Sequence, residues 1–241
     1  MSSAKRKSRT KATSTGGRRA TTRNIAPKIA LAVGMPKTPA PTGWAWSLLT
    51  DLARLESGHT PSRQHPEYWG GKIPWISIQD AREHDGGYIH DTIETTNDLG
   101  IENSSARVLP ANTVCLSRTA SVGYVVVMGR SMATSQDFVN WVCSDKLDHN
   151  YLKYVLLAEG DDLLRFASGS VHQTIYFPEV KAFHICHPPI TEQKRIVRQL
   201  DKLQTEAAEL KKTCERKLAA VEELKKSIFH DALTGQLRKV G

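Results

Sequence analysis

The chain has 241 residues, 39% hydrophobic and 24% charged, which suits one folded domain with appendages. Its four cysteines are far apart and form no CxxC pair, so the sequence excludes a disulfide-rich secreted scaffold and favours a reducing cytoplasm. No apolar run approaches the ~18 residues that a membrane helix needs, and the first residues lack the apolar core of a signal peptide. We therefore expect a cytoplasmic protein without membrane contact.

The formal net charge of +8 is distributed unevenly along the chain. Residues 1–42 contain ten Lys and Arg and no acidic residue, residues 43–187 contain eleven basic and seventeen acidic residues, and residues 188–241 contain twelve basic and eight acidic residues. The middle of the chain is therefore mildly acidic. Its overall basic balance is no argument that this middle part binds nucleic acid.

Residues 1–42 are predicted to form a disordered basic arm. They are rich in Ser, Thr, Lys, Arg and Ala, a composition that cannot bury enough apolar surface to become ordered. One interpretation is an arm that contacts DNA phosphates in a sequence-independent, salt-sensitive manner. The alternatives are a solvated tail or a misassigned start codon.

Residues 43–187 are predicted to form a mixed α/β domain. The stretch WAWSLLTDLARLESG indicates a short helix that begins near Ser47–Asp51 and ends at Gly58. A turn-rich stretch with two X-Pro steps follows, and then a strand from Trp75 to Gln79. A weaker strand is indicated by YIHDTIETT.

The strongest strand signals come from the centre of this domain. Apolar and β-branched runs predict strands at 113–117, 123–128 and 138–143, with a loop at 118–121 and a turn at 129–131. A helix interrupted at Gly160 follows. The last part reads as a loop, one helical turn and a strand that ends at a diproline. These signals place the fold in the α+β class.

Residues 188–241 are predicted to form a long helix and a short tail, with the helix from Thr191 to about Phe229. Thr191 is the expected N-cap, and Gly235 marks the end. Apolar or small residues recur in alternating steps of four and three, interrupted only by Lys217, which is typical of a coiled coil. The stripe comprises Ile196, Leu200, Leu203, Ala207, Leu210, Cys214, Lys217, Val221, Leu224 and Ile228. So narrow a stripe requires a partner helix, and this chain has no second heptad run. We expect the partner to be another chain; the alternative is an ordinary long helix packed on its own domain.

No catalytic motif is apparent in the sequence. A phosphate-binding glycine loop, GxSxG and HExxH are all missing, as are an adenine-methyltransferase tetrapeptide and a carboxylate-plus-lysine nuclease core. His184, Cys186 and His187 could suggest zinc, but they lack a second ligand pair and equally fit an alternating strand. The acidic pairs Asp161–Asp162 and Asp85/Asp91 are interpreted as solvated surface.

Several predicted loops instead carry side chains that can read DNA bases. Arg and Gln form paired hydrogen bonds with guanine and adenine edges in the major groove. Each residue taken alone could equally be ordinary polar surface. The candidate DNA-binding residues are Arg63, Gln64, Arg118, Thr119, Ser121, Arg130, Gln136, His172 and Gln173.

The chain resembles the specificity (S) subunits of type I restriction-modification systems, in the half-subunit form with one target recognition domain. The resemblance covers about residues 43–239, and the basic arm lies outside it. The stretches that carry it are GWAWSLLTDLARLESGHTPSR, PEYWGGKIPWISIQD, NSSARVLPANTVCLSRTASVGYVVV, MATSQDFVNWV, PPITEQKRIVRQLDKL and SIFHDALTGQL. Base-reading residues vary within this family, so the resemblance indicates the domain and not the contacts.

The resemblance implies a non-catalytic subunit that reads a short half-site on double-stranded DNA. Two copies would pair through antiparallel helices, and the helix would set the half-site spacing; the dimer positions are Ile196, Leu200, Leu203, Leu210, Val221, Leu224 and Ile228. The implied partners are methyltransferase (M) subunits, which use S-adenosylmethionine, and restriction/translocase (R) subunits, which use ATP and Mg. This chain itself would hold no cofactor and no metal. Two alternatives stay open: pairing with a different half-subunit, and a coiled-coil adaptor without DNA reading.

Overall fold

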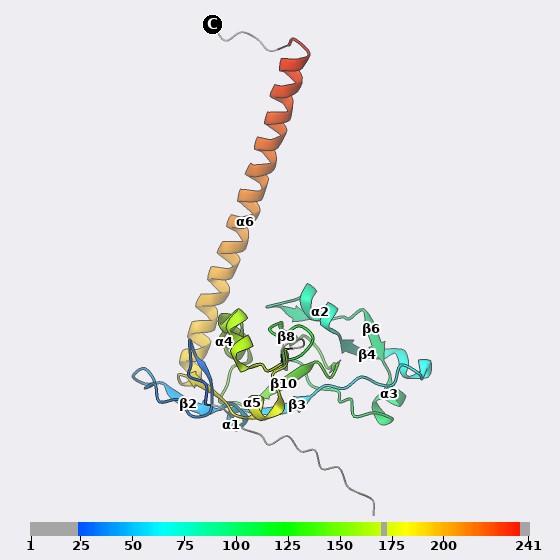
Figure 1. Cartoon of the computed structure of the whole chain (residues 1–241), viewed down its shortest axis with the longest axis vertical. Coiled ribbons are helices and arrows are strands. Elements are labelled where there is room, and N and C mark those ends of the chain that lie inside the picture. Colours follow the sequence, from blue (N-terminus) through cyan, green and yellow to red (C-terminus); the bar gives the residue numbers. More distant parts are fainter. Residues whose placement is uncertain (1–23, 170–172, 237–241) are drawn as a thin grey trace, which may run out of the picture.

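A computed structural model of the protein describes residues 24–169 and 173–236. A sheet-rich globular part carries a single long helix that projects far beyond it (Figure 1). The elements in chain order are β1 (Leu31–Val33), β2 (Ala45–Leu48), α1 (Leu49–Leu52), β3 (Ala53–Ser57), η1 (Pro66–Tyr68), β4 (Trp69–Ile76), α2 (Ile78–Glu83), β5 (Tyr88–Ile89), β6 (Glu94–Thr96), α3 (Asp98–Glu102), β7 (Val114–Ser117), β8 (Val125–Met128), β9 (Ala133–Thr134), β10 (Phe138–Cys143), α4 (His149–Glu159), η2 (Gly160–Phe166), α5 (Phe177–Lys181), β11 (Phe183–His187) and α6 (Ile190–Leu233).

The central sheet has the strand order β3-β10-β7-β8-β5. β10 runs antiparallel to both of its neighbours, so that Val139 lies opposite Ser57 on one side and Leu116 on the other. The three strands predicted at 113–117, 123–128 and 138–143 are confirmed as β7, β8 and β10. Because these strands are antiparallel neighbours, the end of β7, the start of β10 and the end of β3 meet at one edge of the sheet.

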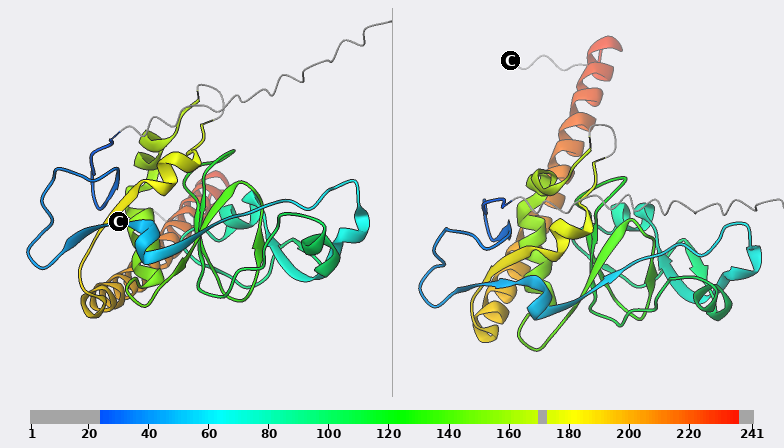
Figure 2. Two further views of the ribbon diagram at one scale, coloured as in Figure 1. Left: turned by 90° about the horizontal axis from the view of Figure 1, so that it is seen from below. Right: turned by 60° about the horizontal axis from the view of Figure 1, so that its bottom comes forward.

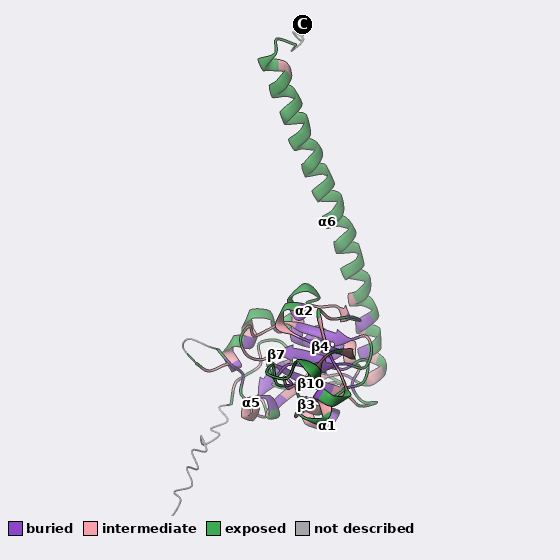
Figure 3. Cartoon of the chain, turned by 90° about the vertical axis from the view of Figure 1, so that its right-hand side faces the viewer, coloured by how far each residue is buried: buried purple, intermediate pink, exposed green. Residues whose placement is uncertain are grey.

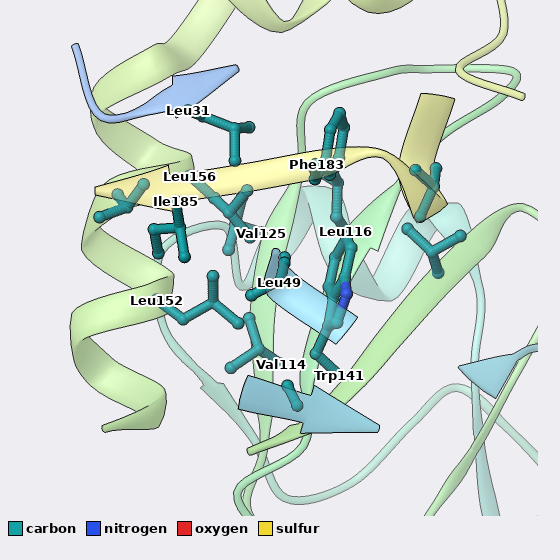
Figure 4. Packing of buried hydrophobic residues seen from close by; sticks show 14 of the residues in the cluster. Leu31, Leu49, Val114, Leu116, Val125, Trp141, Leu152, Leu156, Phe183 and Ile185 are labelled. Carbon is teal, nitrogen blue, oxygen red and sulfur yellow. The ribbon is translucent and has the colours of Figure 1, made fainter. Parts of the chain in front are cut away.

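Both faces of this sheet are buried, which explains the nearly continuous apolar runs in its strands. One face belongs to the main apolar cluster, in which Val114 and Leu116 lie with Leu152 of α4, and Trp141 stacks on Phe183 with 6.3 Å between ring centroids (Figure 4). The opposite face, with Cys115 and Met128 among its residues, forms a second apolar cluster. The sheet is therefore a rigid centre that fixes the positions of the loops at its ends.

Two three-stranded sheets flank the central one, with the strand orders β1-β11-β2 and β6-β4-β9. The first lies beside the base of α6 (Figure 1), and the second lies on the far side of the globular part (Figure 2). The interrupted helix is confirmed as α4 followed by η2, and the last helical turn and strand are α5 and β11.

The boundary expected at residue 42 requires correction, because part of the predicted arm belongs to the fold. Leu31–Val33 form the buried strand β1, which pairs with β11. The buried carboxylate of Glu159 holds this segment, since its Oε1 accepts hydrogen bonds from the backbone N–H groups of Ala30 (3.1 Å) and Leu31 (3.0 Å). Composition does not reveal such an anchor, because it lies in a distant helix. Residues 1–23 lie outside the described residues.

We expect Glu159→Ala to destabilise the protein by about 3–5 kcal/mol, because the change leaves a charged partner uncompensated. Glu159 Oε2 lies 2.7 Å from the Arg165 guanidinium, whose side chain is only 15% exposed. Chemical denaturation measures the free energy of unfolding. The matched control is Asp162→Ala, which removes an exposed carboxylate that pairs with Lys28 and should change little. Equal effects of the two changes would contradict an anchoring role for Glu159.

Two local predictions in the first part of the domain are wrong. The stretch expected to be a helix up to Gly58 contains only one helical turn, α1, between β2 and β3. Leu49 and Leu52 have helical spacing, but the following residues pair with β10, and this tertiary pairing overrides the local signal. The strand expected at 75–79 is the end of β4, after which Ser77 caps α2 through a capping box with Asp80.

The long C-terminal helix is confirmed as α6, of 44 residues. It begins at Ile190 with Pro189 as N-cap, so the N-cap expected at Thr191 is wrong; the rigid φ of proline already suits a helix start. Beyond its first turns the helix is exposed almost throughout (Figure 3). Within the described part of the chain, no helix has both the length and the apolarity that a membrane crossing requires.

Candidate nucleic-acid interface

Loops from five parts of the chain converge where the central strands β3, β7 and β10 end or begin on the same side of the sheet. We name this end of the strands the loop edge. The loops follow β3 and β7, precede β10 and α5, and include the start of α2. His59 N–H donates to Thr134 O (2.9 Å), Arg118 N–H donates to Asp137 O (2.7 Å), and Ile175 N–H donates to Arg118 O (2.8 Å). These backbone hydrogen bonds hold the loops in fixed positions relative to one another.

Arg118 lies at the centre of the loop edge. Its Nη2 donates to the carbonyl oxygen of Gln136 (3.1 Å), and its guanidinium lies 4.8 Å from the Phe177 ring centroid. Its Nε is buried and meets no hydrogen-bond partner among the described residues. Burial lowers the pKa of Arg118, although the nearby Asp137 acts in the opposite direction. A half-buried guanidinium stacked on a ring loses little conformational freedom when it binds a planar partner.

The loop that follows Arg118 has an unusual backbone conformation. Ala120 has φ 62°, a left-handed conformation that is costly for a residue with a Cβ. Thr119, next to it, shares a hydrogen bond of 2.7 Å between its Oγ1 and Thr174 Oγ1. The loop is thus tied to the segment before α5, and one strained residue lies between the candidates Thr119 and Ser121.

Arg63 is held by two aromatic rings and a carboxylate. Its guanidinium lies 3.9 Å from the Trp69 ring centroid and 5.1 Å from that of Trp75. Nη1 and Nη2 donate to the two oxygens of Glu94, at 2.5 and 2.8 Å. Hydrogen bonding to Arg63 lowers the pKa of Glu94, and the same bonds raise the pKa of Arg63. The pair is charged at neutral pH and half exposed, so solvent screens it strongly.

Arg63 and Gln136 line one hollow of about 470 Å³ at the loop edge. Thr60 closes the gap between the two loops, because its hydroxyl donates to Gln136 Oε1. The hollow is also lined by Gln79, in the first turn of α2. Thr60, Gln79 and Phe177 were not among the sequence candidates. The capping box at Ser77 was the signal that could have placed Gln79 at an exposed helix start.

The remaining candidates are distributed differently. Gln173 is exposed beside the tied Thr174, and Gln64 is exposed next to Arg63, so both belong to the loop edge. Ser121 lines a different hollow, of about 290 Å³, together with Asp85 and Asp161. His172 lies outside the described residues.

Arg130 does not join the loop edge. It follows β8, whose other end adjoins the Arg118 loop, so Arg130 lies at the opposite edge of the sheet. There its Nε donates to His90 O (2.6 Å), and its Nη2 lies 2.6 Å from Asp91 Oδ1. The β7–β8 hairpin separates the two arginines. Sequence proximity alone could not show this.

The loop edge has little net positive charge, because Glu94 faces Arg63 and Asp137 faces Arg118. Its polar groups suit hydrogen bonding to base edges better than neutralisation of phosphates. No group of three or more His, Cys, Asp or Glu among the described residues could hold a metal ion. His187, considered above as a ligand, instead lies 2.9 Å from Ser47 Oγ through its Nε2.

The stripe on α6 is the second candidate surface. Its first two positions touch the globular part: Ile196 packs against the main core, and Leu200 lines a cleft beside α4. The later apolar positions are open to solvent. Their exposed fractions are Leu203 59%, Leu210 65%, Val221 62%, Leu224 60% and Ile228 48%. Exposed apolar rows of this length mark interaction surfaces.

The fold thus joins a rigid sheet, with polar loops at one end of its strands, to a long helix with an exposed apolar stripe. The chain belongs to the family of type I restriction modification DNA specificity domains, whose model matches residues 41–220. The match covers the loop edge and most of α6 together.

Comparison with known proteins agrees with this assignment. The chain is 28% identical over 158 residues to the type I restriction enzyme MjaIX specificity subunit of Methanocaldococcus jannaschii, covering 65% of this chain and 37% of the relative. It is 29% identical over 168 residues to the EcoR124I/EcoR124II specificity subunit of Escherichia coli, covering 66% and 41%. The chain thus spans less than half the length of these relatives.

The HsdS subunit of Thermoanaerobacter tengcongensis has a similar fold, with a TM-score of 0.61 and 22% identity over 85% of this chain and 48% of that one. A chain from a structure described as showing complex assembly and conformational transition of the type I R-M system gives a TM-score of 0.70, also at 22% identity, over 85% of this chain and 49% of that one. These likenesses confirm the α+β fold with its long C-terminal helix.

Proposed function

We propose that the chain acts as a specificity subunit of a type I restriction-modification complex. Its globular part reads one half-site of double-stranded DNA through the loop edge, and its α6 stripe pairs with a second copy. The observation that carries this proposal is the family match across both surfaces, residues 41–220. The exposed apolar stripe on α6 supports the pairing, because it has no partner helix among the described residues.

The geometry supports different roles for the two surfaces: the loop edge would contact DNA bases, and the α6 stripe would pair with a second copy. Arg118 is held on the Phe177 ring, which suits a planar donor group for bidentate contact with guanine. Arg63 is held on Trp69 and would have to exchange the carboxylate of Glu94 for a base edge. A two-fold pair of domains suits a symmetric target whose two half-sites are separated by an unread spacer. The rigid helix sets the distance between the two domains and hence the spacer length.

Catalysis is assigned to other subunits in this proposal. M subunits with S-adenosylmethionine would modify adenine, and R subunits with ATP and Mg would translocate and cut DNA. The mildly acidic middle of the chain fits this arrangement, because partner subunits can supply most of the phosphate neutralisation.

Pairing with a different half-subunit would give an asymmetric target. A coiled-coil adaptor would give no sequence-specific footprint at all.

If α6 sets the distance between the two DNA half-sites, a four-residue insertion after Lys212 should change that distance. Four residues add about one turn and ~6 Å to the helix, while DNA rises ~3.4 Å per base pair. We expect the unread spacer to lengthen by about two base pairs, with both half-sites unchanged. Methylation-aware sequencing of DNA modified by the chain with its M subunit measures the recognised sequence. An altered half-site, or an unaltered spacer, would contradict the proposal that the length of α6 sets the spacer length.

We expect the basic side chains of residues 2–23 to make a salt-dependent contribution to DNA affinity. Residues 1–23 hold eight Lys and Arg and no acidic residue, so contact with phosphates would release counterions. Deleting residues 2–23 should weaken binding to non-specific DNA and reduce the salt slope, while leaving the anchored strand β1 intact. Fluorescence titration over a range of salt concentrations measures both quantities. An unchanged slope would favour the solvated tail.

A further inference from the structure

An apolar cleft of about 460 Å³ lies at the base of α6, between this helix, α4 and the segment before β2. Trp44, Tyr154 and Val155 line it, and so do Ile196 and Leu200, the first two positions of the α6 stripe. The stripe therefore runs directly into the cleft, and the two form one continuous apolar surface. Whatever covers the stripe along the helix reaches the cleft at its end.

We propose that the cleft receives the C-terminal tip of α6 from a second copy of this chain, with Ile228 and Phe229 of that copy inserted. The inference rests on the proposed pairing of two copies and adds its register and its contact with the globular part. Ile228 and Phe229 are 48% and 56% exposed in the single chain. Their own helix cannot bring them to the cleft, because the 32 residues from Ile196 to Ile228 span ~48 Å of rigid helix.

The spacing of the stripe determines the register. Its ten positions are symmetric about a point midway between Leu210 and Cys214, so an antiparallel copy can place every position opposite another. Ile228 of one copy then lies opposite Ile196 of the other, at the cleft. The full set of opposed positions is Ile196 with Ile228, Leu200 with Leu224, Leu203 with Val221, Ala207 with Lys217, and Leu210 with Cys214.

Lys217 distinguishes this arrangement from a parallel pair. In a parallel pair the two Lys217 side chains would meet within the stripe, and burying two like charges together is unfavourable. In the antiparallel register each Lys217 faces Ala207, whose small side chain leaves room for the lysine stem to reach solvent. The one break in the stripe therefore favours the antiparallel pair over the parallel one.

The helix tip carries an apolar residue beside the stripe, and the cleft has aromatic lining. Phe229 lies outside the two positions per heptad that a simple helix pair buries, so pairing with one helix would leave it exposed. Next to Ile196 the second copy meets the globular part as well, and there the rings of Trp44 and Tyr154 offer a wider apolar wall. The extra aromatic residue at each tip thus has a site of matching chemistry where it meets the globular part of the other copy.

The test places a photo-crosslinking residue, p-benzoylphenylalanine, at Ala158, which lines the cleft and is exposed. The full-length protein is irradiated, the covalent dimer is isolated, and its tryptic peptides are identified by mass spectrometry. We expect the probe to capture the peptide Ser227–Arg238 of the second copy. The same probe at Ile93, which is 58% exposed and adjoins β6 on the other side of the globular part from α4 (Figure 1), should not capture it.

A second measurement uses Ile228→Asp with Phe229→Asp, which should weaken dimerisation on the order of 100-fold by sedimentation, since two buried apolar side chains are lost. The control Ala219→Asp, on the outer face, should leave the dimer unchanged. Dimers that form without tip capture and ignore the double substitution overturn this inference and leave the proposed pairing in place. A protein that stays monomeric overturns both.

Discussion

Leu203→Glu combined with Leu210→Glu is expected to convert the proposed pair of chains into monomers. Both side chains are more than half exposed in the single chain, at 59% and 65%, so folding of the chain itself should not depend on them. In a helix pair they would be buried, and removing apolar contact while burying unpaired carboxylates costs several kcal/mol, about 3–5 for one uncompensated buried charge. Analytical ultracentrifugation measures the mass, and circular dichroism confirms that α6 is retained.

The matched control places the same two carboxylates on the outer face of α6. Ala208 and Ala219 are exposed helix positions outside the stripe, so Ala208→Glu with Ala219→Glu should leave the dimer intact. Under the proposed function the stripe variant should also lose modification of a bipartite target, because one domain alone would read one half-site. A stripe variant that sediments like the unaltered protein would exclude α6 as the pairing surface.

Arg118→Ala is expected to relax or abolish the choice of DNA site. A guanidinium that forms paired hydrogen bonds with a guanine edge contributes ~1–3 kcal/mol of discrimination against the wrong base. Arg118 is suited to such a contact because Phe177 and the carbonyl of Gln136 hold it in place. Arg118→Lys keeps the positive charge and loses the planar pair of donors, so it should lower specificity almost as much. Methylation-aware sequencing of the modified DNA measures the site choice.

Arg130→Ala is the control for Arg118→Ala. It removes an arginine from the same pair of neighbouring strands, but at the opposite edge of the sheet, where Arg130 pairs with Asp91. Site choice should stay as it is in the unaltered protein. If Arg130→Ala alone changed the site choice, the loop edge would be the wrong interface. If Arg118→Ala left it unchanged, Arg118 would be removed from the contacts.

Contacts between distant parts of the chain decided the elements that local sequence patterns did not predict, β3 and β1. The residues after Leu52 have helical spacing, yet they form β3 because β10 offers a complete antiparallel partner from Ala53 to Ser57. Residues 31–33 belong to a segment without sufficient apolar content to fold alone, yet they become β1 because Glu159 accepts their backbone hydrogen bonds. Both outcomes depend on residues more than eighty positions away, which no local window contains.

The sequence predicted the types of residue in the candidate site. It predicted only partly which of these residues lie together in the folded protein. Arginine and glutamine in loops indicated base reading, and Arg118, Thr119 and Gln136 do meet at one edge. Arg130 looked equivalent in the sequence but lies at the other end of the hairpin. Thr60 and Gln79 joined the site because the folded sheet carries their loops to Gln136, and nothing next to them in the chain indicates this.

The sequence by itself determined the strands of the central sheet, the long helix and its stripe, because these follow from the periodic placement of apolar side chains, which acts locally. It also determined the family, through residues that recur in one linear order. Only the tertiary structure decided which loops share an edge, where the folded part begins and where the stripe meets an apolar cleft. Those properties depend on strand order and on contacts between distant residues, and the chain acquires them only when its sheets have formed.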